Sequence, residues 1–244
     1  MAAALRRCPF AHTVSRASCR PVHMPTRIAE LVVLFGLGPV LLAWLVRRYE
    51  YRAPIAPLLW VLSCAALQAL YSDPTFDAAT LWSWPRDQRV LAFVALRFAI
   101  LGAVLSWLGL WYAPDEFMQL PRRRPWLWLL LVVLYPTLSA VPQCLLWRVL
   151  FVQRYAGLFE HRTELLAAGA LAFSIAHLTY RSARALVVTA IGGALFLDTY
   201  LRSGSLLLSA AEHGAYGILA FSAGLGRFMQ MGRRWRLQPH TSSA

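Results

Sequence analysis

Three groups of polar or ionisable residues lie inside segments that are otherwise apolar enough to span a membrane. They are Gln143-Cys144-x3-Arg148, Phe173-x3-His177 and Glu212-His213-x3-Gly217. A titratable side chain at bilayer depth is costly, and by default it marks a functional site. Imidazole, carboxylate and thiol groups could together support acid–base, nucleophilic or metal chemistry.

The apolar runs that must position these groups predict an all-α, polytopic membrane protein. Hydrophobic residues make up 59% of the 244 residues, and the mean hydropathy is +0.51. Soluble domains are less apolar. We expect about seven transmembrane helices, each near the length of about 20 residues that crosses the hydrocarbon. Their ranges are 28–46, 54–71, 90–113, 125–155, 164–180, 184–200 and 204–228.

The charge pattern indicates a membrane surface as the partner. The net charge of +13 comes from arginine alone, because the chain contains no lysine. Arginines cluster near the predicted span ends, at 47–48, 122–124 and 233–234. There they would contact membrane lipids, so we do not expect a nucleic-acid partner. With residues 1–23 set aside, the loop charges favour an outside N-terminus and an inside tail.

The chain divides into four parts. A basic N-terminal segment at 1–27 is followed by membrane helices at 28–124, a core at 125–228 that holds all three groups, and a polar tail at 229–244. The first residues lack the apolar stretch of a signal peptide, and we favour Met24 as the true start. The four cysteines show no disulfide or metal-site spacing.

Arg148 needs an explanation at its depth in the predicted span. Cys144 and Arg148 lie four residues apart and therefore share a helix face. An unpaired guanidinium in hydrocarbon is strongly disfavoured, so a partner is expected. The alternative is that Arg148 extends to the interface beside Arg154.

Either histidine alone could be a hydrogen-bonded packing residue. His177, His213 and Glu212 come from two further helices, however, and such groups can converge with Arg148 in the interior of a helical bundle. Asp198 lies four residues before Arg202, which favours a structural ion pair.

In their order and spacing the motifs resemble the CPBP family of intramembrane proteases. This family includes the CAAX prenyl proteases and bacteriocin-processing, Abi-type proteins. Its pattern is Glu-Glu-x3-Arg, then Phe-x3-His, then His-x3-Asn. Here Arg148, Phe173, His177 and His213 match, and Gly217 replaces the asparagine. The similarity covers about residues 125–228, which we interpret as a CPBP-like protease core.

The local sequence also resembles one branch of the family, which reads Pro-Gln-Glu and Glu-His-x3-Gly. Pro142-Gln143 and Glu212-His213 fit that branch. The resemblance implies an endopeptidase that hydrolyses a peptide bond of a lipidated or membrane-anchored substrate near the interface. It also implies that His177 and His213 bind a divalent metal such as zinc or stabilise an oxyanion. Gln143, Cys144 or Glu212 would stand in the general-base position, with Arg148 as electrostatic support.

The departure from the family lies at its two glutamates, which are replaced by Gln143 and Cys144. A buried carboxylate can be tuned into a base, whereas glutamine cannot. Glu212 could supply the missing carboxylate, or a histidine could activate the Cys144 thiol in a nucleophilic or metal-thiolate site. Otherwise hydrolysis is lost, and the chain is a catalytically impaired binding, scaffold or immunity protein. Enzyme activity is therefore left open.

Two remote alternatives use the same residues. His177 and His213 could ligate a haem, and Glu212 with Asp198 could form the proton relay of a transporter. Under every interpretation the chain is a multi-pass integral membrane protein, and we expect a bacterial-type cell membrane.

Overall fold

The computed structural model describes residues 24–49 and 55–226, and within these ranges every regular element is helical. The all-α membrane class is thereby confirmed. The predicted start region before Met24, the polar tail at 229–244, Cys8 and Cys19 lie outside the described residues.

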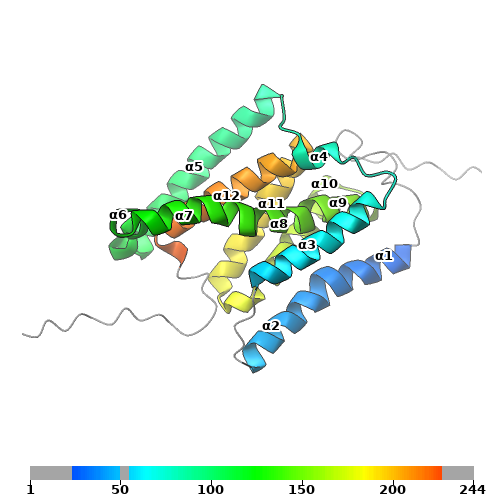
Figure 1. Cartoon of the computed structure of the whole chain (residues 1–244), viewed down its shortest axis with the longest axis horizontal. Coiled ribbons are helices and arrows are strands. Elements are labelled where there is room, and N and C mark those ends of the chain that lie inside the picture. Colours follow the sequence, from blue (N-terminus) through cyan, green and yellow to red (C-terminus); the bar gives the residue numbers. More distant parts are fainter. Residues whose placement is uncertain (1–23, 50–54, 227–244) are drawn as a thin grey trace, which may run out of the picture.

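The long helices follow the apolar segments of the sequence (Figure 1). The first is continuous through α1 (Met24–Leu31), η2 (Val32–Leu37) and α2 (Gly38–Arg48). It is followed by α3 (Ile55–Tyr71) and α5 (Gln88–Tyr112). The last elements of the described chain are α10 (Arg162–Ala176), η7 (Leu178–Tyr180), α11 (Ala183–Ser203) and α12 (Leu206–Ser222). Short helices connect them: α4 (Ala79–Trp82), η3 (Pro114–Glu116) and α6 (Gln119–Arg123).

Between α6 and α10 runs one composite helix. Its parts are α7 (Pro125–Tyr135), η4 (Pro136–Ala140), α8 (Val141–Cys144), η5 (Leu145–Leu150), α9 (Phe151–Tyr155) and η6 (Ala156–Leu158). The segments η4 and η5 are π-helical. The first begins at Pro136, whose ring nitrogen cannot donate a hydrogen bond to the preceding turn. Such wide turns are common at functional sites.

Among the described residues, four helices are long and apolar enough to cross a membrane: Met24–Arg48, Gln88–Tyr112, Pro125–Leu158 and Ala183–Ser203. The helix α3 is apolar but shorter. The helices α10 and α12 contain 15 and 17 residues. The predicted count of seven spans therefore stays a prediction.

The composite helix crosses the middle of the molecule (Figure 1) and forms its core. Every residue from Pro142 to Val152 is buried, in contact with α3, α10, α11 and α12. Phe35 of η2 packs edge-to-face on Trp147 and Phe151, with ring centroids 5.9 and 5.3 Å apart. This packing fixes the first motif at the centre of the bundle.

Candidate functional site

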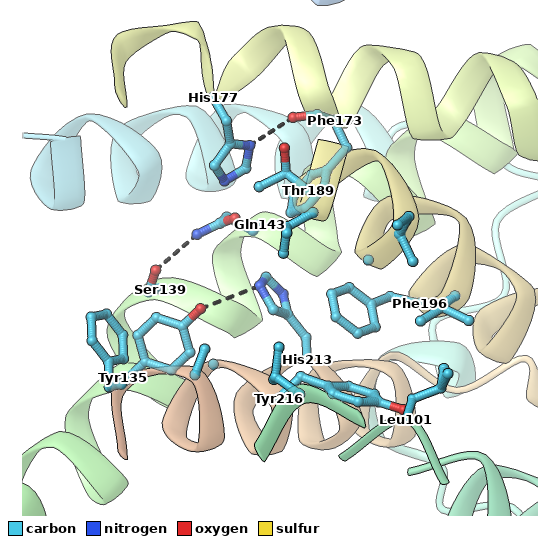
Figure 2. Close-up of a pocket in the computed structure, with 18 of the residues that line it drawn as sticks. Leu101, Tyr135, Ser139, Gln143, Phe173, His177, Thr189, Phe196, His213 and Tyr216 are labelled. Atoms are coloured by element: carbon cyan, nitrogen blue, oxygen red, sulfur yellow. Dashed lines mark hydrogen bonds between the residues drawn. The ribbon is translucent and has the colours of Figure 1, made fainter. Parts of the chain in front are cut away.

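A cavity of about 270 Å³ lies between α5, the composite helix, α10, α11 and α12. Most of its wall is apolar. The polar side chains that face it in Figure 2 include Tyr135, Ser139, Gln143, His177 and His213. The cavity thus brings together one predicted residue from each of the three motifs. None of the described residues that line it is an aspartate or a glutamate.

His177 follows the last turn of α10, and its Nδ1 lies 2.7 Å from the carbonyl oxygen of Phe173. A carbonyl can only accept, so Nδ1 carries the proton and donates it. In the neutral ring this leaves Nε2 as the acceptor. Figure 2 shows the ring directed toward Gln143.

His213 of α12 is held on several sides. Its Nδ1 lies 3.6 Å from the Cys144 sulfur, and its Nε2 lies 3.5 Å from the Tyr135 hydroxyl. The ring stacks on Phe196, with centroids 4.6 Å apart. The imidazole is therefore fixed in position by packing more than by short hydrogen bonds.

Cys144 lies behind His213 and does not line the cavity. Its exposed fraction is 0%. The Ser209 hydroxyl lies 3.8 Å from its sulfur, but the same hydroxyl donates to the Phe196 carbonyl at 2.8 Å, and one proton cannot serve both acceptors well. A buried thiol in such surroundings is normally inert.

Gln143 occupies the cavity wall instead. Its Nε2 donates to the Ser139 hydroxyl at 2.8 Å. Its Oε1 is buried, and no donor among residues 24–49 and 55–226 reaches it. The amide therefore presents an unsatisfied acceptor at this wall.

Arg148 is buried completely, with an exposed fraction of 0%. Its guanidinium lies 4.2 Å from the ring centroid of Phe173 and 5.3 Å from that of Phe196. No acceptor in the described part of the chain reaches any of its three guanidinium nitrogens. The alternative that Arg148 extends to the interface is wrong, because its helix face points into the core and cation–π contacts hold it there.

Glu212 is directed away from the cavity. Both its carboxylate oxygens accept from Arg97 of α5, at 2.8 and 3.0 Å, and Thr199 donates to it at 2.5 Å. Adjacent helical residues point about 100° apart, so the side chains of Glu212 and His213 contact different parts of the bundle. The structure does not bring this predicted site residue to the histidines.

Asp198 extends the same ion-pair cluster. It pairs with Arg202 at 2.8 Å, which confirms the predicted ion pair, and also with Arg97 at 2.9 Å and Arg162 at 2.8 Å. The role of Arg97 could not be assigned from the sequence. Its available signal was a lone arginine inside an otherwise apolar helix.

Tyr135 is a cavity residue that the motif analysis missed. It stands beside Gly217, where an added Cβ would overlap the phenol ring. The third motif therefore needs glycine at 217 so that Tyr135 can approach His213. The only sequence signal was a tyrosine before Pro136 in an apolar run.

The residues present do not form a recognisable metal centre. Across the described residues, no three His, Cys, Asp or Glu side chains are grouped so that they could share an ion. His177 commits Nδ1 to a backbone carbonyl, and His213 lies between a thiol and a phenol. Zinc ligation by His177 and His213 stays a prediction.

Residues 125–219 match the family model described as type II CAAX prenyl endopeptidase Rce1-like. The family resemblance is confirmed. The matched stretch runs from the start of α7 into α12 and contains all three motifs. This match and the apolar helices support an integral membrane protein of intramembrane endopeptidase-like type. No curated protein and no solved structure matches the chain.

Proposed function

We propose that this protein uses its endopeptidase-like cavity to bind the lipidated end of a membrane-anchored peptide without hydrolysing it. The description of the matching family names prenyl endopeptidases, so a prenylated peptide is the ligand class that we propose. We further propose a bacterial-type cell membrane as its place of action.

The shape and lining of the cavity support an apolar ligand. Val104 of α5 and Ile191 of α11 line the cavity, yet 47% and 55% of their surfaces are exposed. The cavity therefore reaches the outer, lipid-facing surface between these two helices. A prenyl chain could enter from the plane of the membrane, and its burial would supply the main driving force.

The observation that carries the proposal is that none of the described residues that line the cavity carries a carboxylate. Peptide hydrolysis needs a base to activate water, or an activated nucleophile. Gln143 cannot take up a proton, Cys144 is buried behind His213, and Glu212 is occupied by Arg97. These features favour binding over hydrolysis.

Peptide hydrolysis is the second candidate, and one observation favours it beyond the family match. Because His177 donates from Nδ1, its Nε2 is in the form that could accept a proton from water. If a metal assists instead, purified protein would contain about one equivalent of a transition metal. A variant with His177→Ala and His213→Ala would lack it.

The binding proposal can be tested with a fluorescent, S-farnesylated CAAX-type tetrapeptide and protein in lipid nanodiscs. We expect saturable binding that the same peptide without the farnesyl group does not compete away. Leu105→Trp fills the cavity and should weaken binding by about tenfold or more. The matched control is Leu96→Trp, at a position on the same helix that is 62% exposed and outside the cavity lining. Equal binding by Leu105→Trp and wild type would contradict the proposal.

A further inference from the structure

We infer that Tyr135, Ser139 and Gln143 form a hydrogen-bonding track that holds the backbone of the bound peptide in an extended conformation. This inference rests on the proposed function. It adds the atoms that recognise the peptide and the conformation in which the peptide is bound.

The three residues of the track lie four positions apart on the composite helix, and all three line the cavity. The π-helical segment η4 lies between the first and the last of them. Residues four apart share a helix face, and because an α-helical turn and a π-helical turn offset them in opposite directions, the mixed helix keeps all three residues near one face. Figure 2 shows the three side chains along one side of the cavity.

Gln143 provides the clearest sign of a missing ligand. Its side chain is 8% exposed, and its Oε1 has no donor among the described residues. A buried acceptor without a donor is unfavourable and uncommon in folded proteins. One Nε2 hydrogen is committed to Ser139, and the atom of the amide that lacks a partner is the acceptor Oε1. A peptide N–H is the group that would satisfy it.

Tyr135 offers the complementary donor. Its hydroxyl lies 3.5 Å from His213 Nε2, well beyond the usual distance of about 2.8 Å for a hydroxyl hydrogen bond. The phenol can therefore turn its proton to a peptide carbonyl. Gly217 provides the room for the ring. The track thus carries a donor at one end and an acceptor at the other.

The spacing of the track suits an extended peptide. Four α-helical residues advance by about 6 Å, the π-helical turn of η4 shortens this advance somewhat, and two residues of an extended chain advance by about 6.6 Å. Backbone groups on one edge of an extended peptide would therefore meet successive residues of the track. A helical peptide satisfies its own backbone groups, so it would gain little here. Inside a membrane, an extended peptide must find such partners, because unsatisfied backbone groups are costly.

Two other hydroxyl groups at the cavity, those of Thr189 and Tyr216, are already used within the protein. Thr189 donates to the Ala185 carbonyl at 2.8 Å, and Tyr216 donates to the Arg97 carbonyl at 3.3 Å. The opposite wall, from α5 and α11, is mainly aliphatic. The cavity is therefore two-sided: the peptide backbone faces the track, and the lipid chain faces α5 and α11.

The experiment measures the affinity of the S-farnesylated tetrapeptide and of analogues with one N-methylated amide each. The proteins are wild type, Gln143→Leu and Tyr135→Phe, with Gln68→Leu and Tyr71→Phe as matched controls at exposed positions outside the cavity. We expect Gln143→Leu and Tyr135→Phe each to lose about three- to tenfold in affinity, and the controls to match wild type. Wild type should bind one of the N-methylated analogues more weakly than it binds the unmethylated peptide. Gln143→Leu should bind that analogue and the unmethylated peptide equally well, because the contact to Oε1 is already lost.

The outcomes separate the two proposals. If wild type binds the farnesylated peptide and both track variants bind it equally well, the track is wrong while the proposed function stands. If N-methylation and Gln143→Leu weaken binding additively, the peptide N–H contacts another group and the track is wrong. If wild type does not bind the peptide at all, both fail. If size-exclusion chromatography shows that a variant is misfolded, the wild-type measurements test the track without it. Equal affinity of wild type for the unmethylated peptide and for every N-methylated analogue would overturn the track.

Discussion

Arg97 of α5 binds both carboxylate oxygens of Glu212 of α12, at nitrogen–oxygen distances of 2.8 and 3.0 Å. The two residues are 115 positions apart in sequence. The pair joins an N-terminal helix to the helix that carries His213, and Thr199 and Asp198 of α11 complete it. Glu212 therefore connects helices instead of serving the cavity.

Arg97→Leu should lower the free energy of unfolding by about 3–5 kcal/mol, because it leaves Glu212 buried without its partner. The double variant Arg97→Leu/Glu212→Leu should recover most of this loss, since both charges are then absent. Thermal or denaturant unfolding in detergent measures the effect. Arg89→Leu, at an exposed position on the same helix, is the control. Equal stability of the single and double variants would show that the pair is not coupled.

Arg148→Met should raise the free energy of unfolding by about 1–4 kcal/mol, the range seen when buried charges are replaced by apolar residues of similar volume. Methionine keeps the contact with the Phe173 and Phe196 rings and removes a guanidinium that has no acceptor in the described structure. The same unfolding assay applies, with exposed Arg47→Met as the control. A clear loss of stability would mean that Arg148 has an anionic partner.

Gly217→Ala should destabilise the protein by about 1–3 kcal/mol, because the new Cβ overlaps the Tyr135 ring and forces a shift. The comparison is Gly36→Ala, where an added Cβ has nothing within 4 Å. That change should be neutral or stabilising by up to about 1 kcal/mol, as expected from helix propensity. If both variants behave alike, the close approach of Tyr135 to α12 is wrong.

Cys144 should resist alkylation by N-ethylmaleimide in the folded protein, since its exposed fraction is 0%. Cys64 is exposed and should react first. The measurement is mass spectrometry of a C8S/C19S variant, which leaves these two thiols, before and after unfolding. Rapid alkylation of Cys144 in the folded protein would instead support a thiol-based site.

The sequence predicted the helices well, because long apolar runs in a membrane protein leave few other conformations. It also predicted that His177 and His213 could converge with Arg148 and Glu212 in the interior of the bundle. The structure brings the two histidines to one cavity, whereas Glu212 pairs with Arg97. That expectation needed only the helical period and the assumption of a bundle interior.

Other parts of the site depend on contacts between distant residues. The role of Tyr135 follows from the missing side chain at Gly217, and no local pattern reveals that the two residues touch. The burial of Arg148 between two aromatic rings depends on how α10 and α11 pack against the composite helix. For Glu212, helical geometry alone indicated that its side chain points away from the His213 side chain. Its partner Arg97 comes from another helix, so no local pattern could identify it.

The most direct test of binding without hydrolysis is mass spectrometry of the S-farnesylated tetrapeptide after incubation with protein. We expect wild type to return the peptide intact at concentrations that saturate the cavity. Cleavage by the variant Gln143→Glu/Cys144→Glu, which restores both carboxylates of the first motif, would show that their replacement is what stops hydrolysis. Cleavage by wild type that is lost on changing His177 and His213 to alanine would contradict the account and establish a working peptidase.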